Sequence, residues 1–397
     1  MTGILCISSY FKGNEFMEAA KKEGAEIVLV AKETLLDKPW AHDSIDRIFP
    51  MPDLEKLPDM IYAVTYLART HQFDRIVALD EYDVPMAATL REHMLVPGMG
   101  ATVARRFRDK LFMRNAAQEA GFKVPAFSPV LNHARLHEFT QDVPPPWVLK
   151  PRWEAGAMGI KRVYNSDELW GYVHELGDEQ SFRVLEQFVP GDVYHVDALT
   201  VDGKTIFNSA QKYGHPPLNV AHDGGIFSTR TLPINKGDGA KLKTLNSKLI
   251  KALGMQNGAT HAEFIKGHDD GEFYMLEIAG RVGGAHISDL IEMTSGINLW
   301  AEWGRLEVAL ARGETYKLPK VSKRYGGLLV CLAKQDHPDL SAYDDPEVIW
   351  RLDKKNHAGL IVTAEKPDRI ETLVNAYCDR FVHDFMAVAP PLDHPAE

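Results

Sequence analysis

Two strand-like segments late in the chain, HAEFI and YMLEIAGR, carry the glutamates Glu263 and Glu277, and a hairpin turn at His268–Gly271 joins them. If the segments pair as antiparallel neighbours, the two carboxylates can point the same way. Two inward acids with no basic partner nearby in sequence repel each other unless a cation lies between them. Mg²⁺ carrying nucleotide phosphates supplies that charge, because it takes one or two carboxylates and completes its octahedron with phosphate oxygens and water. We therefore expect a magnesium site here; two exposed acids on a hairpin are the alternative.

A glycine-rich run follows the second acid. Arg281 comes four residues after Glu277, and the chain continues Val-Gly-Gly-Ala-His. A planar guanidinium and the exposed backbone N–H groups of Gly283 and Gly284 suit an oxyanion or a phosphoryl group. This run favours the metal interpretation of the acid pair, and it places His286 near the substrate.

Two lysines precede this region. Lys110 lies in the helical pattern RRFRDKLFMRNAA, and Lys150 ends the apolar strand of PWVLKPRW. Each is a compact cation able to meet nucleotide phosphates, although a single lysine is usually a solvated surface residue. After Lys150 comes the small-residue turn EAGAMG, from Glu154 through Gly156 to Gly159, which can fold over phosphates.

The segment LEQFVPG, residues 185–191, joins the middle of the chain to a strand-rich part. An acid at a hinge, here Glu186, can accept a hydrogen bond from an adenine amino group. The apolar residues Phe188 and Val189 can offer backbone groups and a surface to the ring. The alternative is an edge strand followed by a turn.

The first residues alternate between apolar runs and an amphipathic stretch, which predicts a βαβ order of elements. A further apolar run, Arg75–Leu79, ends in Asp80-Glu81, so two acids stand at the carboxyl end of a predicted parallel strand, where ligands of open α/β sheets bind. The alternative is that these acids only open the next helix. Beyond Gly100 we expect one long basic helix from Thr102 to Glu119.

These patterns predict five sections. They are an N-terminal α/β domain at 1–100, a linking helix at 101–120, a small lid at 121–192, a strand-rich catalytic part at 193–319 and a C-terminal α+β section at 320–397. The polar stretch from Gln211 to Gly225 is long enough for a working loop. We expect the segment from Gln211 to Thr229 to shape the substrate pocket. Trp300 and Trp303, at helical spacing, are expected in the core.

Charge and composition exclude several classes of function. The chain has 45 Lys plus Arg against 55 Asp plus Glu, a net charge of −10, so it lacks an electrostatic footprint for nucleic acid. Its 3 cysteines suit a reducing compartment, and we expect the cytoplasm. No apolar run approaches the roughly 18 residues of a membrane span, and the first residues lack a signal-peptide pattern. We expect no membrane partner, and the sequence is compatible with a homodimer.

In this order the features resemble the ATP-grasp superfamily, from about Thr102 to Arg312, and the preceding βαβ unit resembles that family's usual N-terminal domain. The resemblance implies an α/β fold of ATP-grasp architecture and the cofactors ATP and Mg²⁺. It implies that Glu263 and Glu277 bind the metal and that Arg281 is catalytic, steadying the reacting phosphate. The nucleotide would be bound by Lys110, Lys150, Glu154, Gly156, Gly159, Glu186, Phe188 and Val189.

Two positions depart from the family's pattern. The family often has asparagine two residues after the second acid, where this chain has Ala279, so metal binding would rest on the two glutamates. Where members commonly have a ribose-binding glutamate after the hinge this chain has Val193, which leaves Asp192 or His195 as the candidate.

The motif EIAGRVGG is most similar to that of the amino-acid ligase branch. That branch implies an ATP-dependent carboxylate–amine ligase that forms an amide between small molecules through an acyl phosphate. A kinase or carboxylase on the same scaffold and a non-catalytic ATP-binding regulator are the alternatives. We do not expect a zinc site among His195, His261 and His286, because different strands separate them and no ligand spacing occurs.

Overall fold

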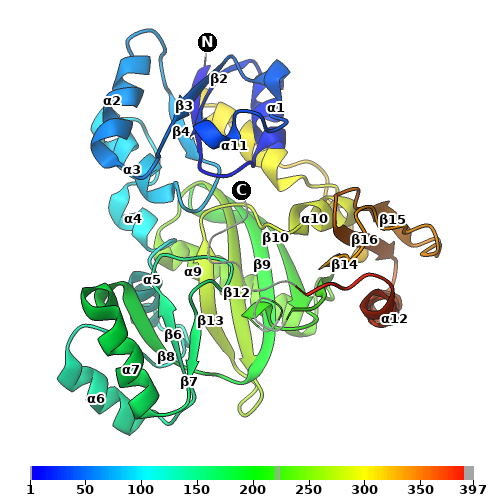
Figure 1. Ribbon diagram of the computed structural model, residues 1–397. Helices are drawn as coiled ribbons and strands as arrows, with labels where there is room; N and C mark the ends of the chain where they lie inside the picture. The colour runs from blue at the N-terminus through cyan, green and yellow to red at the C-terminus, as the bar shows by residue number, and fades with distance from the viewer. Residues whose placement is uncertain (1, 219, 221–223, 389–397) are drawn as a thin grey trace.

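The N-terminal unit is a four-stranded parallel sheet with helices against its faces (Figure 1). The computed structural model describes residues 2–218, 220 and 224–388. Strand order is β3-β2-β1-β4, and β1 is buried along its whole length, as its unbroken apolar run requires when both faces of a parallel sheet are covered. Its elements are β1 (Thr2–Ser8), α1 (Asn14–Lys22), β2 (Ala25–Lys32), the short helical turns Glu33–Leu35 and His42–Ser44, β3 (Arg47–Met51), α2 (Leu57–Leu67), β4 (Arg75–Ala78) and α3 (Val84–Met94).

The connection that follows is two helices, α4 (Ala101–Arg105) and α5 (Lys110–Glu119), so the prediction of one long helix was wrong. The backbone of Asp109 is extended, and its side chain accepts hydrogen bonds from the N–H groups of Leu111 and Phe112. An aspartate in that position starts a new helix. The break places Lys110 in the first turn of α5.

The section predicted as a lid is a small antiparallel sheet, order β5-β8-β6-β7, with helices on one side (Figure 1). Its core includes Trp147 and Leu185 and is separate from the other clusters. Its elements are β5 (Phe127–Pro129), α6 (His133–Asp142), β6 (Trp147–Pro151), β7 (Lys161–Val163), α7 (Ser166–Leu176), the helical turn Gly177–Phe182 and β8 (Arg183–Gln187).

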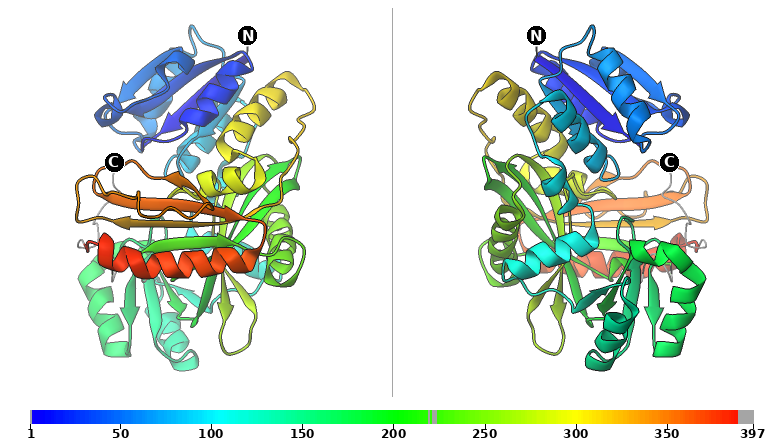
Figure 2. Two further views of the ribbon diagram at one scale, coloured as in Figure 1. Left: turned by 90° about the vertical axis from the view of Figure 1, so that its right-hand side faces the viewer. Right: turned by 90° about the vertical axis from the view of Figure 1, so that its left-hand side faces the viewer.

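An eight-stranded antiparallel sheet forms the rest of the molecule, in the order β13-β12-β9-β10-β11-β14-β16-β15. The strands β14, β16 and β15 of the C-terminal section continue this sheet, and α12 lies along them (Figure 2). The elements are β9 (Gly191–Val201), β10 (Lys204–Tyr213), β11 (Phe227–Thr231), α9 (Gly237–Leu253), β12 (Gly258–Gly267), β13 (Phe273–Ala279), α10 (Ile287–Ser295), α11 (Leu299–Arg312), β14 (Tyr325–Leu332), β15 (Val348–Arg351), β16 (His357–Ala364) and α12 (Pro367–Asp384).

The stretch predicted as a working loop differs from that expectation at its start. Gln211–Tyr213 belongs to β10 and pairs with β11. Part of the remaining stretch, residues 219 and 221–223, lies outside the described residues. Among the residues that the structure describes, none of the helices is both long and apolar enough to span a bilayer.

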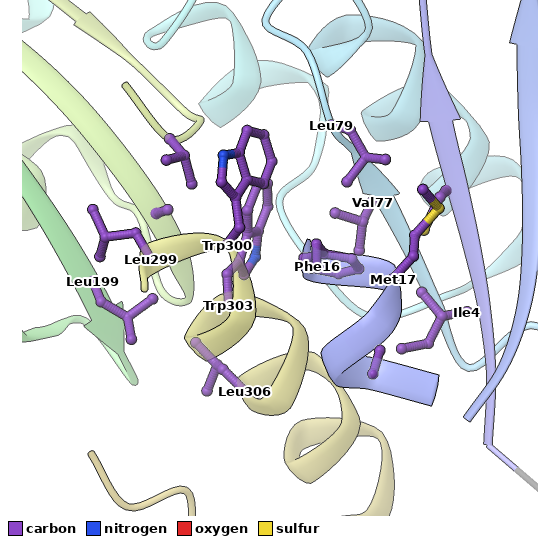
Figure 3. Packing of buried hydrophobic residues seen from close by; sticks show 14 of the residues in the cluster. Ile4, Phe16, Met17, Val77, Leu79, Leu199, Leu299, Trp300, Trp303 and Leu306 are labelled. Carbon is purple, nitrogen blue, oxygen red and sulfur yellow. The ribbon is translucent and has the colours of Figure 1, made fainter. Parts of the chain in front are cut away.

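Helix α11 joins the two large units through a shared core (Figure 3). Trp300 and Trp303 are buried there, as predicted, and the ring of Trp303 meets Phe16 of α1 edge-on at 5.3 Å between centroids. A Cβ on Gly304 would lie 2.4 Å from the carbonyl oxygen of Phe16, so the two helices approach as closely as their backbones allow. This packing fixes the N-terminal sheet against the large sheet that carries the candidate site.

Candidate nucleotide and metal site

The two glutamates face each other across neighbouring strands, as predicted. Glu263 of β12 is the direct register partner of Glu277 of β13. Residues opposite each other in an antiparallel pair have Cβ atoms roughly 5 Å apart on one face of the sheet. Both side chains stay partly accessible, at 18% and 26%, so a cation can reach them. Two carboxylates on one face fit Mg²⁺ held together with nucleotide phosphates.

Lys110 links one acid to the loop of small residues. Its Nζ lies 2.8 Å from Glu277 Oε1, and it also donates to the backbone carbonyl of Glu154. The lysine is buried, which restricts its ammonium group to this corner. The predicted first lysine, second acid and phosphate loop therefore come together in the structure.

Lys150 is held from behind by a buried acid. Its Nζ lies 2.7 Å from Glu186 Oε2, and Arg114 Nε lies 3.0 Å from Glu186 Oε1. Burial lowers the pKa of Lys150 to about 8, although the carboxylate of Glu186 opposes that shift. Burial would raise the pKa of Glu186, but Arg114 and Lys150 outweigh it and the pKa is lowered. The acid predicted for adenine thus also anchors the lysine predicted for phosphates.

Arg114 was not among the predicted site residues. It lies four residues after Lys110 on α5, so both side chains project from one face of that helix. The four-residue spacing from Lys110 was the sequence feature that could have identified Arg114. The predicted hinge follows β8: the N–H of Phe188 donates to the carbonyl of Pro146 at 3.1 Å, and Arg162 lies 4.8 Å from the Phe188 ring centroid. Val189 comes next in the chain, before β9.

The loop predicted to cover the phosphates connects β6 to β7, and its residues 154–159 are half-buried or exposed. Gly156 and Gly159 have φ values of 64° and 63°, and Ala157 between them has 63°. A Cβ on Gly156 would meet nothing within 4 Å. The loop is tied down at its start, where the hydroxyl of Tyr82 donates to Glu154 Oε2 at 3.1 Å.

Arg281 is held in place by Glu81 of the N-terminal domain. Its Nε donates to Glu81 Oε1 at 2.8 Å, and Arg108 donates to the other carboxylate oxygen at 3.4 Å. Burial alone would raise the pKa of Glu81, but Arg281 and Arg108 lower it to about 2. The sequence marked Asp80-Glu81 as a ligand edge without connecting it to Arg281, 200 residues away.

The glycines after Arg281 differ in their surroundings. A Cβ on Gly283 would lie 2.5 Å from Asp197 Oδ1 and 3.0 Å from His261 Nδ1, so close packing requires glycine at that position. Gly284 has nothing within 4 Å of such a Cβ and is the open position. His286 precedes α10 with a φ of 64°, and its ring lies 5.0 Å from that of Trp350 on β15.

His195, Asp197 and His261 form a cluster next to Glu263, which corrects the view that strands keep His195 and His261 apart. His286 pairs instead with Asp289. Asp197 accepts from Nδ1 of His195 and from Nδ1 of His261, both at 2.8 Å. Asp197 and Glu263 outweigh the effect of burial and raise the pKa of His261 to about 10. The β9–β12 register, with His261 opposite Asp197, brings these side chains together.

His195 is enclosed, which corrects its assignment to the ribose. Its side chain is 0% exposed, and its Nε2 lies 2.8 Å from Thr229 Oγ1 while Nδ1 is bonded to Asp197. A ring with both nitrogens engaged offers nothing to a sugar hydroxyl. Asp192 is open to solvent, and its Oδ2 lies 2.7 Å from Lys212 Nζ. Asp192 therefore remains the ribose candidate.

Part of the chain is similar in sequence to known proteins. Residues 143–289 match the family model described as ATP-grasp domain. The L-arginine-specific L-amino acid ligase of Bacillus subtilis is 27% identical over 269 residues, covering 66% of this chain and 63% of the relative. An alanine–anticapsin ligase of Bacillus subtilis is 24% identical over 66% of this chain and 57% of its own length. The chain thus spans less than two thirds of these relatives.

Solved structures are similar over almost the whole chain. The crystal structure of an L-amino acid ligase from Bacillus licheniformis gives a TM-score of 0.77 at 17% identity, with 98% of each chain covered. An N5-carboxyaminoimidazole synthetase from Staphylococcus aureus gives 0.72 at 16% identity, covering 95% of this chain and 97% of that one. Residues 143–289 therefore match the ATP-grasp domain, and the chain's similarities fit the carboxylate–amine ligase branch.

Proposed function

We propose that this protein is an ATP-dependent carboxylate–amine ligase that joins two small molecules through an acyl phosphate. The observation that carries the proposal is the convergence of five side chains from α5, β6, β12, β13 and the segment that follows β13. They are Lys110, Lys150, Glu263, Glu277 and Arg281. Similarity to named ligases supports the amide-forming branch. ATP-grasp chemistry needs positioning and charge neutralisation above all, and these side chains supply both.

The reaction divides into two steps. A carboxylate oxygen of the first substrate attacks the γ-phosphorus of ATP, the bond to the β-phosphate oxygen breaks, and ADP leaves. A neutral amine then attacks the acyl carbon, inorganic phosphate leaves, and the nitrogen loses a proton to give the amide. The acyl phosphate must be kept from water between the steps.

Each residue takes a role from its position. Lys110 and Lys150 bind the nucleotide phosphates, and the loop Glu154–Gly159 covers them. Glu186 with Phe188 and Val189 meets the adenine, and Asp192 meets the ribose. Glu263 and Glu277 hold Mg²⁺, which neutralises triphosphate charge when bound. Arg281, oriented by Glu81, stabilises the transferring phosphoryl group, where a preorganised cation is most effective.

The substrates we propose are an amino acid or other small carboxylic acid and a second amino acid or small amine. Gly284 and His286 lie beside Arg281, where backbone N–H groups and an imidazole can meet a substrate carboxylate. The names of the relatives, an arginine-specific amino acid ligase and an alanine–anticapsin ligase, agree with this class. We place the protein in the cytoplasm, where ATP is available.

A product assay tests the proposal. The full-length protein is incubated with Mg-ATP and a matrix of amino acids, and mass spectrometry detects amides while ADP and phosphate are quantified. We expect an amide with ADP and phosphate in equal amounts, and none from the Glu277→Gln variant. A stable phosphorylated acid formed without an amine would show a kinase instead, and bicarbonate-dependent ADP release would show a carboxylase.

A further inference from the structure

His261 stands in the same row of side chains as the two candidate metal ligands. It comes two residues before Glu263 on β12, so both project from one face of the sheet. Its ring nitrogen Nε2 lies 3.6 Å from Glu263 Oε1. Across the strands, its register partner is Ala279, a methyl group that offers no ligand atom. Nε2 of His261 therefore lies next to the Glu263 carboxylate, at a position where β13 supplies no metal-binding atom.

The ring of His261 is oriented by its other nitrogen. Nδ1 donates to Asp197 Oδ1 at 2.8 Å, and in the free protein, where the pKa of His261 is raised to about 10, Nε2 also carries a proton toward Glu263. A cation that displaces this proton meets the lone pair of Nε2, the atom that faces Glu263. A histidine that binds a metal almost always donates its second ring N–H to a carboxylate or carbonyl in this way. The geometry matches a metal-binding histidine with its supporting acid already in place.

Asp197 is itself fixed. Its second oxygen accepts from Nδ1 of His195 at 2.8 Å, and both residues are fully buried. Each oxygen of Asp197 thus serves one imidazole at hydrogen-bond distance. These three residues lie close enough to suggest a metal site of their own, but both Nδ1 atoms are directed at Asp197. The cluster supports the ring of His261 and leaves only its Nε2 for a cation.

We propose that His261 Nε2 and Glu263 together ligate the nucleotide-bound divalent cation, and that this mixed set binds Mn²⁺ more tightly than Mg²⁺. The inference rests on the proposed nucleotide site. Two atoms that each bind one cation at about 2.2 Å lie roughly 3 to 4 Å apart, which the 3.6 Å spacing satisfies. Mg²⁺ prefers an all-oxygen shell, whereas affinity for imidazole rises along the transition metals beginning with Mn²⁺.

The test reads the metal directly. Mn²⁺ and ADP are bound to the full-length protein, and pulsed electron paramagnetic resonance records the nuclei coupled to the manganese. We expect a directly bound imidazole ¹⁴N in the wild type, replaced by a ¹⁵N coupling when the protein is made with [¹⁵N]histidine. This arm needs no substitution, so it does not depend on how a variant folds.

Two variants test whether the coupled nitrogen belongs to His261. His261→Asn should abolish the coupling and weaken Mn²⁺-ADP binding by about tenfold or more, with a smaller loss for Mg²⁺-ADP, both measured by calorimetry. His93→Gln, an exposed histidine in the last turn of α3, should change neither value.

Bound Mn²⁺-ADP without a histidine coupling in the wild type would overturn the inference while leaving the ligase proposal standing. A coupling that persists in His261→Asn would do the same. If Mn²⁺-ADP and Mg²⁺-ADP both fail to bind the wild type, the nucleotide site itself is wrong, and the ligase proposal is overturned with the inference.

Discussion

The floor of the site and the loop above it are built in opposite ways. On the floor, Lys110 and Lys150 are each about 4% exposed, and each is fixed by a carboxylate within 2.8 Å. In the loop Glu154–Gly159 the residues are half-buried or exposed, and three of them have positive φ values. The loop's side-chain tie to the N-terminal domain is the bond from Tyr82 to Glu154.

This difference separates two requirements of the proposed chemistry. Charges that must be in place before ATP arrives are set by strand register and burial, at the cost of desolvating them. The part that must open for ATP and then exclude water is drawn from residues with few packing contacts. We expect substitutions on the floor to remove binding or turnover, and substitutions in the loop to change how fast and how completely the site closes.

The largest effect should come from the floor. Glu277→Gln keeps the shape of the side chain but removes one of two negative charges facing the metal and triphosphate. Several kcal/mol of transition-state stabilisation correspond to a loss of about 10²-fold or more in turnover. Initial rates of ADP formation would measure it, with circular dichroism as a check on the fold. Full activity with an unaltered magnesium dependence would mean that Glu277 is only a surface acid.

Lys150→Ala should weaken nucleotide binding by about tenfold to a hundredfold, because a buried cation next to the phosphates is lost. Glu186 keeps Arg114 as a partner, so the variant should still fold. Calorimetric titration with ADP measures the affinity. Lys123→Ala removes a lysine from an exposed ion pair with Asp270 and is the matched control. Equal affinities for both variants would remove Lys150 from the site.

Much of the floor could be predicted from local sequence, because its elements are local. A two-residue period and a tight turn were enough to pair Glu263 with Glu277, and Lys150 was found at the end of an apolar strand. The break before Lys110 was missed even though Asp109 is a helix-capping residue, since the charged pattern continued through it. The apolar runs indicated the βαβ order of the first domain, and the ATP-grasp architecture followed from the resemblance to that family.

Other contacts could not be read from sequence because register and domain packing create them. His261 meets Asp197 across 64 residues only because β12 pairs with β9 in one alignment. A one-residue slip would turn either side chain to the opposite face. Glu81 reaches Arg281 because α11 fixes the N-terminal sheet against the large sheet, and no local pattern encodes that docking.

The loop should respond to nucleotide where the floor does not. Hydrogen exchange at residues 154–159 should slow several-fold when Mg-ATP binds, whereas the amides of β12 and β13 should already be protected. Gly156→Ala places a Cβ at a φ of 64°, which costs about 1 kcal/mol of backbone strain without a clash. We expect this variant to alter closure and turnover by less than tenfold. Identical exchange with and without nucleotide would show that the loop is no lid.

The smallest effect concerns protonation on the floor. With its pKa lowered to about 8 by burial, Lys150 loses its charge in the free protein as the pH rises through 8, whereas phosphates bind the charged form. Nucleotide affinity should therefore fall about twofold between pH 7 and pH 8, with proton uptake on binding near pH 8. For folding the sign is opposite: above pH 8 the unfolded chain holds a proton that the folded protein has released, so this group makes unfolding less favourable as the pH rises toward its unfolded pKa. Lys150→Arg, which stays charged, should bind ADP with a flat pH profile over this range. A profile for the wild type as flat as that of the arginine variant would show that the floor holds Lys150 charged throughout, and the contrast between a desolvated floor and a solvated loop would then lose its electrostatic part.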